Sequence, residues 1–290
     1  SLTTPSAAVI KNGPGTLLLG GVNSFGGGVR VNAGEVKVSR NEALGATGTT
    51  VLLGEGTTFG AVATADTPVS FYWTSNAGAW QKHVVVAADR TIKLDTAGGA
   101  TYAIIDVDHD WGYPLTRSAG QLIFFGKLQH NNADPAPAGT LVKTGAGLLE
   151  LRNTSAYDNR IAALEIRRGV VDIHHRLALG VANPTITVYR NAQLVVRDVT
   201  NVDLSNVTVL GYTNRFASGM PDIYTANWWR GAGALRFDTN VGSDTAFVAP
   251  TAPITGILEF ADWVDQGTTS TQTFRMGNQS ILVVNRDAAF

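Results

Sequence analysis

One phrase is written twice in this chain, and its repetition constrains the fold more than any other feature. The first copy is 10-IKNGPGTLLL-19 and the second is 142-VKTGAGLLEL-151. Each copy has a lysine, then a turn with glycines, then an alternating apolar run. Farther along, 29-VRVNAGEVKV-38 corresponds in the same order to 164-LEIRRGVVDI-173. Segments that recur in order indicate a repeat architecture, in which each unit stacks on the next.

The segments between the turns have the periodicity of short β-strands. Val29, Val31, Val36 and Val38 alternate with other residues, which places each valine pair on one face of its strand. Turns rich in glycine or asparagine separate these runs. Short strands with frequent turns are typical of a β-sandwich or of a β-solenoid.

We expect the solenoid: an all-β, single-stranded right-handed parallel β-helix (β-solenoid) with loop excursions. In such a helix each coil of roughly 20–25 residues adds ~4.8 Å to the stack and directs its valines, leucines and isoleucines inward. Glycine at the corners adopts the positive φ that tight turns need. The alternative is a two-layer β-sandwich, which would require antiparallel pairing between 29–31 and 36–38.

Residues 10–45 are similar to the autotransporter-associated β-strand repeat of bacterial passenger domains. That family's phrase runs Lys-Thr-Gly-x-Gly-Thr-Leu-x-Leu, then Asn-x-Tyr/Phe-x-Gly-Gly, then Val-x-x-Gly-x-Leu, then Leu-Gly. The later elements correspond here to Asn23, Phe25, Gly26, Gly27, Val31, Gly34, Val36, Leu44 and Gly45. The second copy, 140–180, has Asp158-Asn159 in place of the glycine pair. The resemblance implies a passenger-type β-helix, with a signal peptide upstream and an outer-membrane barrel downstream of these residues.

We expect residues 1–290 to form one continuous β-solenoid with repeat-like blocks at 9–59 and 139–196. Alternating or apolar runs predict further strands at 91–95, 102–108, 121–128, 204–211, 234–240, 256–260 and 281–285. Short helical turns that end at glycine fit 41–45 and 176–180. The segment 212–233 is polar, aromatic and non-repetitive, so we expect an irregular excursion there.

The composition excludes several classes of partner and site. The formal net charge is −1, so nothing indicates nucleic acid or an anionic membrane surface. No apolar run reaches the ~18 residues that a membrane-spanning helix needs. The chain has no cysteine, which excludes disulfides, thiolate metal sites and a cysteine nucleophile. It begins at Ser1 without a signal peptide, as a mature fragment or a cytosolic chain would.

The segment 106-DVDHDW-111 is the candidate metal site. Asp106, Asp108 and Asp110 could bind Ca²⁺ if the segment curled, although it lacks the glycine and the bidentate glutamate of an EF-hand. One alternative is a strand with these carboxylates on the solvent face. Another is glycan cleavage, because neighbouring carboxylates on one strand face fall near the ~5–10 Å that paired glycosidase carboxylates need.

The pair His174-His175 follows a predicted strand. Adjacent side chains on a strand point to opposite faces, so these two imidazoles cannot share one metal ion. We expect a surface or corner pair.

Aromatic side chains gather in the excursion 212–233. The candidates for contact with a glycan or protein partner are Tyr212, Tyr224, Trp228, Trp229 and Arg230, because exposed rings beside arginine stack on sugars or pack on a partner. The alternative is that these rings pack the excursion against the coils. The segment 71-FYWTSNAGAW-80 poses the same choice.

No catalytic residue and no cofactor are predicted, since the chain has neither a phosphate-binding loop nor a nucleophile elbow. We expect an extracellular or bacterial cell-surface β-solenoid, a structural or adhesive stalk or filament that presents loops to host or matrix glycans or proteins. End-to-end or lateral self-association is also expected, because an open coil end is an exposed strand edge. The alternative is a polysaccharide-binding or polysaccharide-cleaving β-helix, which would bring two carboxylates together with arginine or histidine in a lateral groove.

Overall fold

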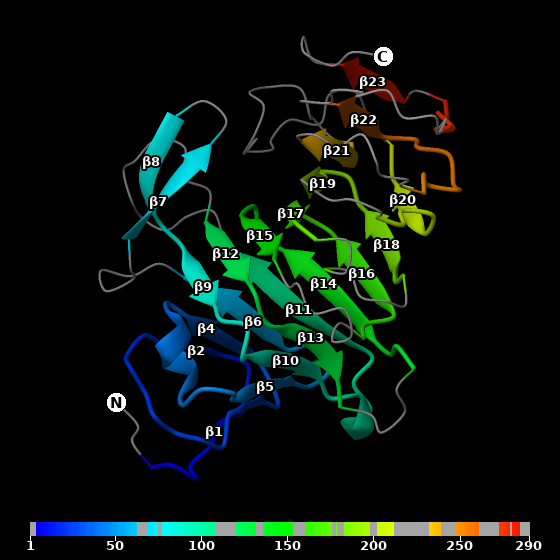
Figure 1. Ribbon diagram of the computed structural model, residues 1–290. Helices are drawn as coiled ribbons and strands as arrows, with labels where there is room; N and C mark the ends of the chain where they lie inside the picture. The colour runs from blue at the N-terminus through cyan, green and yellow to red at the C-terminus, as the bar shows by residue number, and fades with distance from the viewer. Residues whose placement is uncertain are drawn as a thin grey trace.

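The computed structural model describes residues 4–62, 69–74, 77–107, 120–131, 136–152, 160–175, 178, 183–197, 202–211, 232–238, 248–260, 273–278 and 280–284. In these ranges the regular structure is β-strand, apart from the short 3₁₀ turns η1 (Asn41–Leu44) and η2 (Thr96–Gly98). The strands form long parallel ladders that rise from the N-terminal end, in blue, to the C-terminal end, in red (Figure 1). The expected all-β parallel β-helix is confirmed.

Three ladders make up the β-helix. Sheet 1 contains β1 (Val9–Lys11), β3 (Val29–Val31), β5 (Thr50–Leu53), β10 (Thr91–Leu94) and β13 (Lys127–His130). Sheet 2 contains β2 (Thr16–Leu19), β4 (Glu35–Val38), β6 (Thr58–Ala61), β11 (Tyr102–Val107), β14 (Thr140–Thr144), β16 (Ala163–Ile166), β18 (Thr185–Val188) and β20 (Val207–Val209). Sheet 3 contains β9 (Val84–Val86), β12 (Gln121–Phe124), β15 (Leu148–Leu151), β17 (Gly169–Ile173), β19 (Ala192–Arg197), β21 (Ala234–Asp238), β22 (Ile257–Phe260) and β23 (Ile281–Val284).

The register of the ladders gives the coil length. Val29 pairs with Val51 and Leu149 with Val171, each 22 residues on, whereas Thr16 pairs with Glu35 after 19 residues and Gly169 with Ala192 after 23, so the coil length varies around 22 residues. The strands β3 and β4 lie in different sheets, and both pair only in parallel with their ladder neighbours. The antiparallel pairing that a β-sandwich would need between 29–31 and 36–38 is therefore absent.

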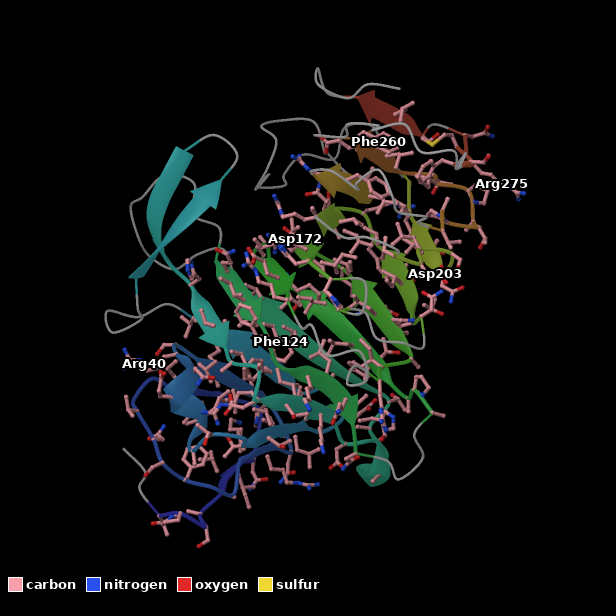
Figure 2. The ribbon with its side chains drawn as sticks, viewed as in Figure 1. Arg40, Phe124, Asp172, Asp203, Phe260 and Arg275 are labelled. Carbon is pink, nitrogen blue, oxygen red and sulfur yellow. The ribbon has the colours of Figure 1, made fainter. Side chains whose placement is uncertain are left out.

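Alternation along each strand builds one apolar column between the sheets. In sheet 3, five neighbouring strands place an inward aliphatic side chain at the same position of the ladder. These residues are each at most 1% exposed: Leu149, Val171, Leu194, Leu235 and Leu258. Figure 2 shows such side chains filling the interior from Phe124 to Phe260. Near the C-terminal end the Phe237 and Phe260 rings stack with centroids 5.3 Å apart. Each coil thus buries its apolar face on the coils above and below it.

The two copies of the repeated phrase occupy different corners of the β-helix. The first copy turns from β1 in sheet 1 to β2 in sheet 2, whereas the second turns from β14 in sheet 2 to β15 in sheet 3. Sheet 2 takes part in both corners: it follows the first copy of the phrase and precedes the second. The two copies therefore lie at neighbouring corners of the β-helix. The phrase therefore encodes a corner and does not encode membership of a particular sheet.

A buried lysine ammonium closes each of these corners. Lys143 Nζ donates to the carbonyl oxygens of Thr144 at 2.5 Å, Gly145 at 2.9 Å and Arg168 at 3.1 Å. The first two carbonyls belong to the lysine's own turn, and the third belongs to the next coil. Carbonyl oxygens at a tight turn have no strand partner, so the ammonium satisfies them and joins two coils at once.

The first copy repeats this arrangement. Lys11 Nζ donates to the carbonyl oxygens of Asn12 at 3.1 Å, Gly13 at 2.6 Å and Ala33 at 3.1 Å. The residue after each distant carbonyl is a glycine with positive φ, Gly34 at 77° and Gly169 at 74°. A Cβ on Gly169 would lie 2.5 Å from the carbonyl oxygens of Gly145 and Gly147, so a larger residue would separate the coils.

The turn after η1 is fixed by a buried arginine. Arg90 is 2% exposed, and its guanidinium donates to the carbonyl oxygens of Gly45, at 2.9 Å, and Ala46 and to the Thr49 hydroxyl. Burial lowers the pKa of Arg90, but a guanidinium remains charged at any physiological pH. Gly45 has a φ of 88°, in agreement with the helical turn predicted at 41–45 to end at glycine.

One described element leaves the coils. The antiparallel hairpin β7 (Val69–Thr74) and β8 (Ala77–Lys82) lies in the chain between β6 and β9, and it projects away from the ladders (Figure 1). Its strands pair with each other and with no coil strand among the described residues. The sequence indicated aromatic residues here and did not predict a hairpin.

Replacing Lys143 by methionine tests the corner. The variant keeps most of the side-chain volume but leaves three carbonyl oxygens without their donor, so we expect the free energy of unfolding to fall by about 3 kcal/mol. Urea denaturation followed by circular dichroism measures the change. The control is Lys93→Met, because Lys93 lies half-buried on β10 and should change stability by less than about 0.5 kcal/mol. Equal effects of the two substitutions would contradict the role of the corner lysine.

Candidate functional site

The candidate metal site is described only in part. Asp106 lies on the outer side of sheet 2, where it accepts a hydrogen bond from Thr144 Oγ1 at 2.7 Å and stands 4.0 Å from Lys37 Nζ. Gly60 lies between Lys37 and Asp106 in the ladder and leaves room for the lysine side chain to cross. Asp108 and Asp110 lie outside the described residues.

Within the described ranges, no group of three histidine, aspartate or glutamate residues could hold a metal ion. Asp106 bonds to Thr144 and lies near Lys37 on the outer side of sheet 2. The calcium site stays a prediction.

The aromatic candidates also lie outside the described residues. Tyr212, Tyr224, Trp228, Trp229 and Arg230 all fall in 212–231. The backbone of 71–74 and 77–80 is described as part of the hairpin β7–β8, but the side chains of Tyr72, Trp73 and Trp80 are not. Contact between these rings and a partner stays a prediction.

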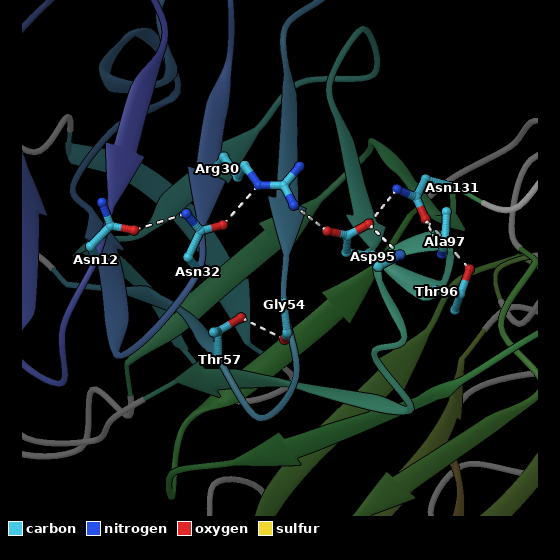
Figure 3. Close-up of polar contacts among 10 residues, drawn as sticks. Asn12, Arg30, Asn32, Gly54, Thr57, Asp95, Thr96, Ala97 and Asn131 are labelled. Carbon is cyan, nitrogen blue, oxygen red and sulfur yellow. Dashed lines mark hydrogen bonds and ion pairs between the residues drawn. The ribbon is translucent and has the colours of Figure 1, made fainter.

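A polar ladder runs along the corner that follows sheet 1 (Figure 3). It consists of the residues directly after consecutive strands, namely Asn12, Asn32, Gly54, Asp95 and Asn131. Asn32 Nδ2 donates to Asn12 Oδ1 at 2.8 Å, and Asn131 Nδ2 donates to Asp95 Oδ1 at 2.6 Å. Asparagine side chains of successive coils therefore bond to their neighbours on the outside of the coils.

Gly54 interrupts this ladder, and an arginine crosses the gap. Arg30 Nε donates to Asn32 Oδ1 at 2.8 Å, and its Nη2 lies 2.6 Å from Asp95 Oδ2. Asp95 also accepts from the backbone N–H of Gly98 at 3.1 Å. The side-chain donors and acceptors of this corner bond to one another, so the corner joins coils and offers no converging groups for catalysis.

The outer side of sheet 3 carries a second constellation, which we call the charged ladder: Glu150, Arg152, Asp172, His174 and Arg197. Glu150 and Asp172 are direct cross-strand partners on β15 and β17, and both side chains are 0% exposed. Like charges opposite each other on a sheet repel, and burial strengthens the repulsion. The pair therefore depends on nearby cations.

Two arginines supply those cations: Arg152, two residues after Glu150, and Arg197 on β19, the strand next to β17. Arg152 Nε lies 2.7 Å from Glu150 Oε2, and Arg197 Nε lies 2.9 Å from Asp172 Oδ2. Gln121 donates a further hydrogen bond to Glu150 Oε1 from the strand on the other side. Each carboxylate is thus held by one guanidinium.

His174 lies between the two carboxylates. Its Nε2 is 3.5 Å from Asp172 Oδ2 and 3.7 Å from Glu150 Oε2, and its side chain is 16% exposed. We expected a surface or corner pair with His175, and the sequence did not indicate that His174 joins two carboxylates. The signal was available: Glu150 and Asp172 are acidic residues at outward positions of otherwise apolar strands, one coil length apart.

The charged ladder meets one condition for a polysaccharide-cleaving β-helix and fails another. Two carboxylates, two arginines and a histidine do converge, and an imidazole close to both carboxylates puts them within the ~5–10 Å of paired glycosidase residues. A glycan must also reach those carboxylates, however, and neither has any exposed side-chain surface. The geometry fits an internal ion-pair network better than a catalytic groove.

Removing Glu150 tests the network against a matched pair in the next coil. Glu150→Ala removes the buried carboxylate that Arg152 and Gln121 bond to, so we expect a loss of about 2–3 kcal/mol in the free energy of unfolding. Glu165 and Arg167 have the same sequence spacing and lie 2.8 Å apart, but their side chains are 26% and 54% exposed. Glu165→Ala should cost less than about 1 kcal/mol. If chemical denaturation gave similar losses for the two variants, burial of Glu150 would add nothing to the stability that its ion pair contributes.

His83, just before β9, makes stability depend on pH. It is 5% exposed, and burial lowers its pKa below the ordinary value of 6.5, with Arg152 acting in the same direction and Glu150 against it. The unfolded chain therefore binds this proton more readily than the folded chain does. Stability is complete above pH 6.5 and falls as the pH drops below it.

We expect His83→Gln to flatten this decline. Between pH 7 and pH 5 the free energy of unfolding should fall more steeply with pH in the wild type than in the variant. The two slopes should differ by at most the value for a single proton, about 1.4 kcal/mol per pH unit. Thermal denaturation of wild type and variant across this range measures it. Parallel curves would show that His83 does not carry the dependence.

Comparison with known proteins agrees with the resemblance seen in the sequence. Residues 9–38 match the passenger-associated-transport-repeat family. Over 144 residues the chain is 33% identical to the adhesin BmaC autotransporter of Brucella suis biovar 1 (strain 1330), a region that covers 49% of the chain and 4% of the adhesin. No solved structure matches the chain.

These matches confirm that the chain carries an autotransporter-type passenger repeat. They support an extracellular or cell-surface location for this repeat. In the described part of the chain, no helix is long and apolar enough to span a membrane.

Proposed function

We propose, from the passenger repeat that this chain carries, that its 290 residues form one continuous β-solenoid acting as an adhesive stalk outside the bacterial cell. The stalk presents lateral excursions to glycans or proteins of a host surface or matrix. The observation that carries the proposal is the contrast between the coils and the hairpin β7–β8. Polar side chains of the coils form hydrogen bonds and ion pairs with those of neighbouring coils, whereas the hairpin pairs with no coil strand among the described residues.

The coils are suited to a stiff support. Parallel ladders, a continuous apolar column and corner lysines tie each coil to the next along sheets 1, 2 and 3. In a solenoid each coil contacts only its neighbours, so length is added without redesign of the core. The side-chain ladders on sheets 1 and 3 are bonded internally and leave recognition to other segments.

The excursions are suited to recognition because they can vary without disturbing the stack. Segments that leave a rigid scaffold are where binding residues concentrate in proteins. The hairpin contains Tyr72, Trp73 and Trp80, and 212–233 contains Trp228 and Trp229. Aromatic rings supply the stacking surface that sugars and protein partners need. The adhesin match supports a binding role of this kind.

Deleting the hairpin tests this division of labour. Replacing residues 64–81 by Gly-Ser-Gly should preserve the coils, because the corner between β14 and β15 needs only residues 145–147. We expect a Tm within about 4 °C of wild type, since few ladder contacts are lost. We expect loss of binding, measured on a glycan array and on immobilised matrix proteins.

A double variant, Trp228→Ala with Trp229→Ala, separates the two excursions. Reduced binding of either variant with an unchanged fold supports the proposal and identifies the contact segment. Wild-type binding by both variants, or no binding by the wild-type chain, contradicts it. The polysaccharide-cleaving alternative has its own readout: release of reducing ends that disappears in Glu150→Gln would favour it.

A further inference from the structure

The corner that follows sheet 2 carries three arginines on two adjacent coils. Arg167 and Arg168 come directly after β16, and Arg190 follows β18 by two residues. The strands β16 and β18 are neighbours in the ladder, so the arginines extend from one coil and from the next at the same corner. Arg168 and Arg190 are exposed, and the side chain of Arg167 is 54% exposed. We call Arg167, Arg168, Tyr189 and Arg190 the arginine corner.

Carboxylates do not compensate the arginine corner as arginines compensate the charged ladder. One ion pair is formed, with Arg167 Nη2 2.8 Å from Glu165 Oε2. Arg190 Nε donates to the carbonyl oxygen of Gly211 at 2.6 Å, and neither Arg168 nor Arg190 forms an ion pair within the described ranges. Like charges on adjacent coils repel each other. An anion from outside the molecule would neutralise this exposed pair.

The first half of the chain shows that the fold does not need arginine at these places. The two copies of the repeat run in the same order, which places Ala33 where Arg168 stands and Glu55 where Arg190 stands. The carbonyl oxygens of Ala33 and Arg168 each accept from a corner lysine at 3.1 Å. Glu55 and Arg190 are each followed by a residue with a φ of 63°. The backbone of the corner is thus built in the same way with or without the arginines.

The chemistry of arginine indicates what the corner binds. A planar guanidinium donates two parallel hydrogen bonds to a sulfate or carboxylate group. Arg167 Cζ lies 5.9 Å from the centre of the Tyr189 ring, which helps to hold that guanidinium in place. Nucleic acid, with one charge per ~1.7 Å, is bound through many cations, and a net charge of −1 opposes it. A glycan with separated anionic groups fits three arginines better.

We propose that the arginine corner binds the sulfate or carboxylate groups of an anionic polysaccharide. The proposal rests on the proposed adhesive function and specifies one class of its partner. An anionic group of the glycan is held between Arg168 and Arg190 and neutralises both, while Arg167 stays paired with Glu165. The corner lies inside the stack, with β14 on one side and β20 on the other, so it does not depend on how the stack begins or ends.

Binding to immobilised heparin, hyaluronan and uncharged dextran measures this recognition. Heparin carries sulfate and carboxylate groups, whereas hyaluronan carries carboxylate groups alone. We expect the wild-type chain to bind heparin and not dextran, with an affinity that falls as NaCl rises from about 50 to 300 mM. Binding to both anionic glycans assigns the corner to sulfates and carboxylates alike, and binding to heparin without hyaluronan assigns it to sulfates.

The double variant Arg168→Ala with Arg190→Glu gives the corner the residues of the first copy. It should fold normally, with a Tm within about 4 °C of wild type, and bind heparin at least about tenfold more weakly. The control Lys93→Ala with Arg275→Glu changes the net charge by the same amount elsewhere in the chain and should bind like wild type. Equal weakening by the two double variants would show an effect of net charge alone and overturn the proposal.

Two results with the wild-type chain also overturn it. One is absence of binding to both heparin and hyaluronan, and the other is equal affinity for double-stranded DNA, which would make the corner a general polyanion site. The hairpin deletion separates this inference from the proposed function. Heparin binding that the arginine variant loses and the hairpin deletion keeps supports the corner, whatever the excursions bind. Heparin binding that only the hairpin deletion loses contradicts the corner and leaves the proposed function standing.

Discussion

The corner at which one strand ends and the next begins is the feature on which the rest of this β-helix depends. Strands of three or four residues cannot hold their own register, and a turn leaves backbone carbonyls without ladder partners. Lys11 and Lys143 supply the missing donor and reach the next coil with the same ammonium group. The glycines that follow let the coils approach within hydrogen-bonding distance. At these two corners the ammonium and the glycine hold adjacent coils together.

The same closure explains how one phrase serves two places. The bonds of the lysine ammonium involve only its own turn and the next coil, so they form in the same way whichever two sheets the corner joins. Sheet 1 extends from β1 to β13, sheet 3 from β9 to β23, and sheet 2 from β2 to β20, so all three sheets are present together only between β9 and β13.

The outer sides of sheets 1 and 3 carry different kinds of polar side chain. Along sheet 1 the groups are mostly neutral amides that bond in line, with Arg30 and Asp95 joining across a glycine. Along sheet 3 two carboxylates lie side by side without solvent exposure and rely on Arg152 and Arg197. Removing one member of such a buried set leaves the remaining charges less well compensated, which is why Glu150 should respond to substitution more strongly than the exposed Glu165 of sheet 2. Neither ladder presents the open groove that catalysis on a polysaccharide requires.

The sequence by itself indicated the coil strands near the repeated phrase, the glycine corners and the parallel fold, because alternation of apolar residues and glycine turns are local signals, but it did not indicate the hairpin β7–β8. Val29, Val31, Val36 and Val38 are all buried, as their spacing predicted. Only the tertiary structure decided that the second corner joins a different pair of sheets and that Glu150 meets Asp172 and His174. Those relations depend on which residues lie one coil apart, and the coil length varies along the chain. A local pattern contains no record of such lengths, so the partners within the charged ladder become visible only when the coils are stacked.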